Sequence, residues 1–203
     1  MQTTKDYIRK LLLETAQKAF FEKGFKSVSM REISKLSGIG LSNIYNYFSC
    51  KDDIFVQIVT PAVRTFENML DEHHRRRGTD IMAMCDRDYF KYMVDEYTSF
   101  IHRHRDLLLL LLFRSQGSSL ENYKEEFARK STALVKEYFT LMKHKHPQLE
   151  TDISDFSIRM HTVWMFALFE ELLMRRVKPD EIEKVVTEYM TIEVAGWREL
   201  MKI

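Results

Sequence analysis

The sequence predicts an all-α protein. Only six Gly and three Pro occur in 203 residues, and long stretches contain neither, which favours helices over a strand-rich sandwich or barrel. Apolar residues make up 45% of the chain and charged residues 30%, which is typical of a globular chain with a substantial core. In the segments between the breaks, apolar residues recur at helical spacing. We therefore expect about nine helices.

Charge is distributed unevenly along the chain. Residues 1–51 hold nine Lys and Arg against four Asp and Glu, a net charge of +5. Of the chain's 31 basic and 30 acidic residues, the other 22 and 26 lie in residues 52–203, a net charge of −4. A basic head on an acidic body is typical of a polyanion-binding module joined to a non-binding domain, although ordinary solvated surface charge gives the same pattern. We expect a domain boundary between residues 51 and 52.

The stretch SMREISKLSGIGLSNIYNYF, residues 29–48, predicts two short helices joined by a tight turn. Ser29 and Glu32 fit a capping box, so the first helix begins at Ser29. Val28 and Ile33 stand at the two positions of a hydrophobic staple around this cap. Gly38 suits the left-handed conformation that commonly ends a helix.

The second short helix has an apolar face and a polar face. The apolar face follows helical spacing through Leu41, Ile44, Tyr45 and Phe48, and the opposite face presents Ser42, Asn43, Asn46 and Tyr47. Two such helices form a helix-turn-helix, whose second helix fits the major groove of DNA. There Asn can pair with adenine, and Ser can bond to several bases. A helical hairpin with a solvated polar face is the alternative interpretation.

The next segment, YFSCKDDIF, predicts the start of another helix. Ser49 suits its N-cap, with Asp52 at the third helical position. Lys51 then falls in the first turn, where the helix dipole disfavours a cation unless an anion binds nearby. Helix N-terminal amides and a lysine together can hold a DNA phosphate. Alternatively, Asp52 and Asp53 simply neutralise Lys51.

The N-terminal ~60 residues resemble the DNA-binding domain of TetR-family transcriptional regulators. The resemblance rests on an F-x-x-G-F turn at residues 21–25, an I-x-x-x-x-G-[IV] pattern at 33–39, a Y-x-Y-F ending at 45–48, and the following Lys51. It implies a three-helix DNA-binding domain over residues 1–51, with the helix-turn-helix at 29–48. It also implies a C-terminal helical domain, residues 52–203, for effector binding and dimerisation.

The resemblance places Ser42, Asn43 and Asn46 near bases. The residues expected near phosphates are Ser29, Tyr45, Tyr47 and Lys51, and Arg31 and Leu41 complete the candidate DNA-binding set. The family usually has a small polar residue followed by Lys at the start of the recognition helix, whereas this chain has Gly40 and Leu41. Leu41 could therefore meet a thymine methyl group or pack inward.

The C-terminal region reads as a series of helices. We expect helices near residues 54–70, 88–103, 106–115, 119–145, 152–177 and 180–201, with a break at the basic segment HHRRRGTD, residues 73–80. Ser118 and Glu121 suggest a second capping box. The apolar run LLLLLLF, residues 107–113, is far shorter than the ~18 residues that span a bilayer, so we expect a fully buried helix and no membrane partner.

The last two helices are candidates for a dimer interface. The segment HTVWMFALFEELL, residues 161–173, is apolar nearly all round, so one face can serve its own core while another contacts a partner. We expect a twofold homodimer, which the TetR resemblance also implies; a monomer with both helices in its own core is the alternative. The candidate interface residues are Trp164, Leu168, Leu172, Tyr189 and Trp197.

Aromatic and Met residues gather in the middle helices, where they suit either an adaptable apolar pocket or an ordinary core. The TetR resemblance implies a pocket for a small-molecule effector. The candidate pocket residues are Tyr89, Met93, Tyr97, Phe100, Phe113, Arg114, Gln116, Asn122, Tyr123 and Phe127.

Catalysis and cofactors have little support. No nucleophile elbow, glycine-rich phosphate loop or zinc-protease motif is present. The histidine pairs at 73/74, 102/104 and 144/146 have a spacing that turns neighbours to different helix faces, which argues against a metal. Cys50 and Cys85 are isolated thiols, which suits a reducing cytoplasm. We expect a dimeric, effector-responsive repressor that binds a palindromic operator; a structural DNA-binding protein or a helical enzyme or metal sensor are the alternatives.

Overall fold

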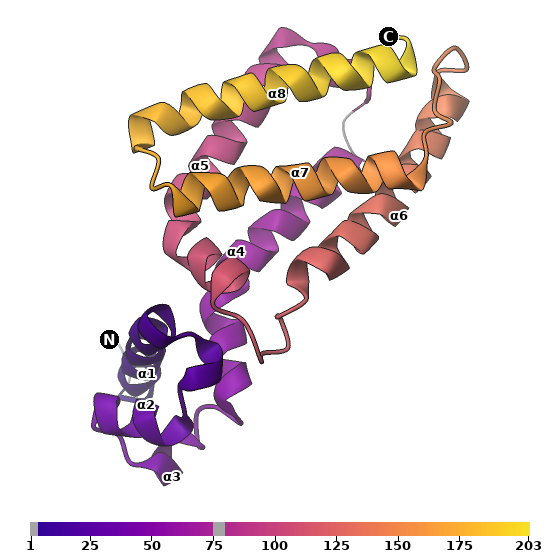
Figure 1. Cartoon of the computed structure of the whole chain (residues 1–203). Helices are drawn as coiled ribbons and strands as arrows, with labels where there is room; N and C mark the ends of the chain where they lie inside the picture. The colour runs from indigo at the N-terminus through magenta and orange to yellow at the C-terminus, as the bar shows by residue number, and fades with distance from the viewer. Residues whose placement is uncertain (1–3, 75–79) are drawn as a thin grey trace. The chain divides into compact units, whose positions relative to one another are not determined.

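The structure is a computed structural model that describes residues 4–74 and 80–203. Within these residues the chain forms eight α-helices and two short 3-10 turns and contains no strand, so the predicted all-α fold is confirmed (Figure 1). The break predicted at residues 73–80 lies largely outside the described residues, as does the side chain of Cys85.

The chain divides into two compact units. The first comprises residues up to Arg64 together with His104–Tyr123, and the second comprises Thr65–Arg103 and Lys124–Ile203. This division differs from the boundary expected after residue 51. The first part of α4 (Lys51–His74) belongs to the first unit, and so does the segment His104–Tyr123. The functional division at residue 51 stays a prediction.

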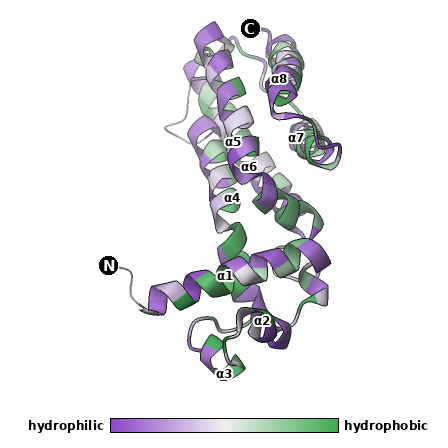
Figure 2. Cartoon of the chain, turned by 90° about the vertical axis from the view of Figure 1, so that its left-hand side faces the viewer, coloured by the Kyte–Doolittle hydropathy of each residue, from purple (hydrophilic) through white to green (hydrophobic). Residues whose placement is uncertain are grey.

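The first unit is built around α1 (Thr4–Lys23), which packs against α2 (Met30–Ser37) (Figure 2). A 3-10 turn, η1 (Phe25–Ser27), follows α1, and a single helical turn, α3 (Leu41–Ile44), follows α2. The rings of Phe20, Phe25 and Phe55 meet at centroid distances of 5.1–5.6 Å and form the centre of this core. Edge-to-face and tilted ring contacts of this kind stabilise a core beyond the area they bury.

The predicted boundaries of α2 are confirmed. The Ser29 hydroxyl accepts a hydrogen bond from the Glu32 amide at 3.1 Å, which is the serine half of the expected capping box. The Glu32 carboxylate pairs with Lys23 instead. Val28 and Ile33 are both buried beside this cap. Gly38 ends the helix with φ of 72°, a left-handed conformation that a residue with a Cβ adopts only with strain.

The second unit combines the rest of α4 with most of α5 (Arg87–Phe113) and three further helices. These are α6 (Tyr123–Lys145), α7 (Asp155–Met174) and α8 (Pro179–Met201), and α7 and α8 lie side by side (Figure 1). The ring of Phe66 on α4 is surrounded by the rings of Phe100, Phe127, Phe166 and Phe169 at centroid distances of 4.6–5.4 Å. This aromatic cluster joins α4, α5, α6 and α7.

Two expected helix boundaries differ from the structure. The helices expected at 88–103 and 106–115 form one element, α5, with non-helical backbone at His104 where the break was expected. The helix expected from residue 119 begins at Tyr123 instead. The Ser118 hydroxyl accepts from the Leu120 amide, and the Glu121 carboxylate accepts from the Gly117 amide, so these two residues stabilise a turn rather than a capping box.

No helix among the described residues is long and apolar enough to cross a membrane. The apolar run at residues 107–113 forms the end of α5, where Leu108, Leu110 and Leu111 are buried and the others are half-buried. It is therefore a core element, as expected, although it is not buried on every side.

Candidate nucleic-acid interface and ligand cavity

The polar residues expected to face DNA are exposed. Ser42, Asn43 and Asn46 all project from α3 and the turn that follows it, and the Asn46 amide donates to the Asn43 side-chain oxygen at 3.3 Å. Ile44 and Phe48 are buried on the opposite side, and this anchoring fixes which residues of the short helix point outward. Arg31 and Ser29 are exposed as well. The exposed amides and hydroxyl form a surface able to bond to base edges.

Tyr45 is a correction to the predicted helix faces. Helical spacing grouped it with the inward residues, but its side chain is 51% exposed. The reason is that α3 is regular only through Ile44, and the following residues form turns in which Tyr47 donates its amide to the Ile44 carbonyl. Tyr47 and Leu41 are half-buried, so neither residue is fully committed to the core or to the outer surface.

Lys51 has an internal structural role. Its ammonium donates to the carbonyl oxygens of Phe25 and Val28, both at 2.8 Å, and lies 4.0 Å from the centre of the Phe25 ring. Burial lowers the pKa of this ammonium, and the Asp52 carboxylate opposes the shift. The phosphate contact expected of Lys51 therefore has to come from an amine that already bonds to two backbone carbonyls.

The first turn of α4 uses its acidic residues differently from the expectation. Asp53, rather than Asp52, accepts from the Ser49 amide at 3.1 Å and from the Ser49 hydroxyl at 3.3 Å. Asp52 instead accepts from the Ser119 amide at 2.8 Å. A second link joins the same region, because the Phe25 amide donates to the Arg114 carbonyl at 2.9 Å. The segment between α5 and α6 is thus bonded to both η1 and α4.

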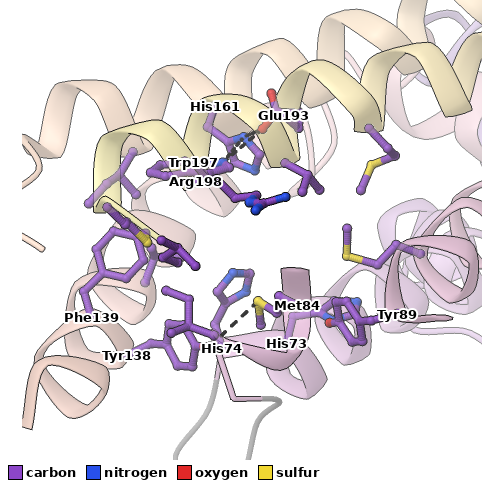
Figure 3. Close-up of a pocket in the computed structure, with 18 of the residues that line it drawn as sticks. His73, His74, Met84, Tyr89, Tyr138, Phe139, His161, Glu193, Trp197 and Arg198 are labelled. Carbon is purple, nitrogen blue, oxygen red and sulfur yellow. Dashed lines mark hydrogen bonds and ion pairs between the residues drawn. The ribbon is translucent and has the colours of Figure 1, made fainter. Parts of the chain in front are cut away.

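The second unit contains a cavity of about 130 Å³ (Figure 3). Its lining residues come from the last turn of α4, from α5, α6, α7 and α8, and from the segment before α5. Most of the wall is apolar or aromatic, including Met84, Met93, Tyr138, Phe139 and Met190. Such a wall, with a few polar groups, is typical of a small-molecule site.

Polar groups lie on two sides of the cavity. Figure 3 shows His161 and Glu193 with Trp197 on one side, and His73, His74 and Tyr89 on the opposite side. Glu193 is buried, and its carboxylate accepts from the Trp197 indole N–H at 3.1 Å and contacts His161 Nδ1. This carboxylate therefore has its hydrogen-bonding partners within the second unit.

On the opposite side, His73 joins two elements. Its Nε2 lies 2.7 Å from a Glu96 carboxylate oxygen, and its Nδ1 contacts the Tyr89 hydroxyl. Burial lowers the pKa of the neighbouring His74 to about 3, with further lowering by His73 and His161, while the Leu70 carbonyl opposes the shift. His74 is consequently a neutral imidazole at physiological pH.

Three of the ten residues predicted for the effector pocket line the cavity, namely Tyr89, Met93 and Tyr97. Burial raises the pKa of Tyr97, whose hydroxyl bonds to Met165 Sδ at 3.5 Å. The other seven do not line it. Phe100 and Phe127 belong to the aromatic cluster of the second unit, and the remaining five, in the first unit, are Phe113, Arg114, Gln116, Asn122 and Tyr123.

Sequence reasoning missed the cavity's polar groups. Glu193 carried a usable signal, because it is a lone acid in the apolar run TIEVAGW of the last helix. His161 stands likewise at the start of an apolar run. His73 and His74 were considered only as a metal pair, and their adjacency gave no indication that both would line one cavity. Among the described residues, no group of three or more potential metal-ligating side chains is present.

The predicted dimer residues have different environments. Leu172 and Tyr189 are buried in their own unit, so they are not available to a partner, and Trp197 lines the cavity. Trp164 is 42% exposed, and Leu168 is half-buried. Further apolar side chains on α7 and α8 are exposed, and they are Phe156, Met160, Val163, Met174, Ile192 and Leu200.

Comparison with known proteins explains the arrangement of the first unit. Residues 12–58 match the sequence model of the family described as bacterial regulatory proteins, tetR family. This part of the chain is similar to the TetR family of bacterial regulators. The match covers the latter part of α1, then η1, α2, α3 and the start of α4, so the exposed residues of α3 lie within the region that is similar to the TetR family.

Curated relatives agree with this assignment. An uncharacterised helix-turn-helix transcriptional regulator of Bacillus subtilis strain 168, YhgD, is 34% identical over 64 residues, which are 32% of this chain and 34% of YhgD. Across the first relatives found, this chain spans between 34% and 66% of their length.

Solved structures extend the likeness to the whole fold. NalD, the secondary repressor of the MexAB-OprM multidrug efflux pump in Pseudomonas aeruginosa, superposes with a TM-score of 0.60 at 17% identity, covering 92% of this chain and 95% of NalD. FadR of Bacillus subtilis in complex with stearoyl-CoA gives a TM-score of 0.58 at 16% identity, covering 92% and 98%. At these identities the likeness shows that this chain has the all-α fold of TetR-family regulators.

Proposed function

We propose that this protein is a transcriptional regulator that binds a palindromic operator as a homodimer and is released from it by a small-molecule effector. The observation that carries the proposal is the exposed polar surface of Ser42, Asn43 and Asn46 within a TetR-family helix-turn-helix. The net charge of +5 over residues 1–51 supplies the attraction to DNA phosphates. Repression is the expected direction of regulation, and the protein acts where its DNA is, in the cytoplasm.

A second copy of the chain is the proposed partner of α7 and α8. Phe156, Met160 and Val163 recur at spacings of four and three on α7, so they share one face, and all three are exposed. Ile192 and Leu200 extend the exposed apolar surface along α8. A twofold helix-turn-helix dimer formed through this surface would read two half-sites about 34 Å apart.

The cavity of the second unit is the proposed effector site. Two of its lining residues, His73 and His74, lie in the last turn of α4. The first turn of the same helix contains Lys51, Asp52 and Asp53. Ligand contacts at one end of this continuous helix can therefore bias its position and change the spacing of the two DNA-binding units. Linkage requires effector and operator to weaken each other's binding by the same factor.

The first experiment measures binding of the full chain to DNA flanking its own gene and to scrambled DNA of equal length. Fluorescence anisotropy over a salt series separates sequence-selective binding from charge attraction. Selective binding with two chains per site supports the proposal. Equal and weak binding to both DNAs would favour a structural DNA-binding protein, and no binding at low salt would reject DNA as a partner.

Asn46→Ala then tests the proposed reading surface. If Asn46 reads a base, the variant loses ~1–3 kcal/mol at the specific site and keeps its affinity for random DNA. Lys18→Ala provides a control, because Lys18 is exposed on α1 and outside the proposed reading residues. An equal loss on both DNAs in Asn46→Ala would show that Asn46 does not read the sequence.

A further inference from the structure

The size of the cavity limits what it can hold in the form seen here. Its volume of about 130 Å³ is close to that of an engineered apolar protein cavity of roughly 150 Å³ that binds benzene. A group of about one aromatic ring therefore fits without rearrangement. Met84, Met93 and Met190 in the wall can adjust to the outline of such a group, because methionine is unbranched and flexible.

The charges of the lining residues indicate the chemistry of the ligand's polar end. Glu193 already bonds to Trp197 and His161, and His73 already contacts Glu96 and Tyr89. His74 is uncharged at neutral pH. Arg198 differs from all of them, because no hydrogen bond or ion pair joins its guanidinium to another side chain in the described part of the molecule.

Arg198 is placed to meet a ligand. Figure 3 shows its side chain extending from α8 into the cavity, beside Trp197 and facing His74. Arg198 is both a lining residue and exposed, so the cavity reaches solvent beside this residue. A ligand could then bury an apolar body between the aromatic walls and leave its charged end at the opening.

We propose that this cavity binds a monocarboxylate whose apolar body is about one aromatic ring in size, with Arg198 pairing with the carboxylate. A guanidinium matches a carboxylate with two parallel hydrogen bonds. A cationic ligand would meet Arg198 unfavourably. A dianion would bring a second charge close to the buried Glu193 carboxylate, and the lining residues that the structure describes include no second uncommitted cation. The inference rests on the proposed function, since the ligand would be the effector.

Phenylacetate, phenylacetamide and phenethylamine form a matched probe series with an anionic, a neutral and a cationic end. Isothermal titration calorimetry of the full chain should give the tightest binding for phenylacetate. Arg198→Gln should weaken phenylacetate about tenfold or more and leave phenylacetamide unchanged. Lys184→Gln is the control, because it removes a positive charge from the exposed side of the same helix, outside the cavity.

Three results would overturn the assignment: tighter binding of phenethylamine than of phenylacetate, equal phenylacetate binding by Arg198→Gln and the native chain, or no binding of phenylacetate. The first and third use the native protein, so they hold even if the variant folds poorly. Anisotropy with operator DNA separates this inference from the proposed function. Phenylacetate that binds through Arg198 without changing DNA affinity leaves the site assigned and contradicts the effector role. Release of DNA by phenethylamine would support the effector role and contradict the assignment of a carboxylate ligand.

Discussion

At the scale of single residues, Lys51 connects parts of the first unit that are distant in sequence. Its ammonium bonds to the carbonyls at both ends of the segment that includes η1, and it also faces the Phe25 ring. Those carbonyls belong to the segment between α1 and α2, whereas Lys51 begins α4. One side chain therefore fixes the position of α4 against the turn that leads into the helix-turn-helix.

Lys51→Gln should destabilise the protein by about 2 kcal/mol, because it removes charge-assisted hydrogen bonds and a cation–π contact. Urea unfolding measures the change in the free energy of unfolding. Lys26→Gln is the control, since Lys26 is exposed in the same turn. If Lys51 also binds a phosphate, the slope of log affinity against log salt concentration for DNA binding should be shallower by about one in the variant. A loss of DNA affinity with full stability would contradict the structural role.

Asp80 is the residue whose ionisation should matter most for acid stability. Its carboxylate bonds to His146 Nε2 at 3.0 Å, to the Met82 amide at 2.9 Å, and to Lys145. Burial alone would raise its pKa, but these bonds outweigh burial and lower the pKa from 3.8 to about 2. Because the folded-state pKa lies below the ordinary value, the stabilisation is complete above pH 4 and is lost as the pH falls towards 2.

The native chain should therefore lose about 2 kcal/mol more stability between pH 5 and pH 2 than Asp80→Asn does. The two proteins differ at this carboxyl group alone, so the titration of other acids cancels in the comparison. Urea unfolding at a series of pH values gives both curves. Parallel curves over this range would show that Asp80 has no depressed pKa in the folded state.

At the scale of elements, the segment between α5 and α6 is bonded to η1 and to the start of α4. The Asp52 carboxylate on α4 accepts from the Ser119 amide, and the Arg114 carbonyl accepts from the Phe25 amide of η1. Asp52 and Asp53 both lie in the first turn of α4, where each carboxylate interacts favourably with the helix dipole. They differ in partner, because Asp53 bonds to Ser49 and Gln57.

This difference gives a matched pair of variants. Asp52→Asn should speed hydrogen exchange of the Ser119 amide several-fold, since the bond loses its charge assistance, while the Ser49 amide stays unchanged. Asp53→Asn should speed exchange of the Ser49 amide and leave that of the Ser119 amide unchanged. Exchange followed by NMR resolves the two amides. Faster exchange at both amides in both variants would mean that the first turn of α4 responds as one unit and that Asp52 does not hold the segment separately.

The same elements show which features the sequence predicts. Ser29, Glu32 and Gly38 act through bonds within a few residues, so their pattern was sufficient to place α2. Ser118 and Glu121 have the same local pattern but do not form a cap, because the neighbouring Ser119 amide bonds to Asp52, 67 residues away in the chain. Local patterns cannot reveal a competing partner of this kind.

The cavity illustrates the same limit. Tyr89, Met93 and Tyr97 were predicted because aromatic and Met residues gather in the middle helices and the TetR resemblance implies a pocket there. Arg198 and Glu193 line the cavity only because α8 packs beside α7 and across from α4, and this packing joins residues more than 100 positions apart. The apolar content of the last helix predicted burial, but it did not distinguish a partner's interface from an internal cavity.

At the scale of the whole molecule, the exposed and buried faces of α7 and α8 divide the predicted dimer residues into two groups. Leu172 is 2% exposed and belongs to the core of its own chain, whereas Phe156 is 72% exposed on α7. A dimer formed through this surface would bury Phe156, Met160 and Val163 of both copies, and a twofold axis would place equivalent faces together. A charge on this face should therefore affect association more than folding.

Phe156→Glu should be monomeric at concentrations where the native chain is dimeric. At concentrations where both proteins are monomeric, their unfolding midpoints should differ little. Sedimentation velocity measures the mass, and Tyr7→Glu is the control because Tyr7 is exposed on α1. Leu172→Ala should leave association unchanged and cost about 2–5 kcal/mol of folding free energy, because it creates a cavity in the core. A native chain that sediments as a monomer, or a Phe156→Glu variant that stays dimeric, would exclude this face of α7.

If the operator has two half-sites, the monomeric variant should also lose selective DNA binding, because the specific affinity depends on both DNA-binding units engaging one site.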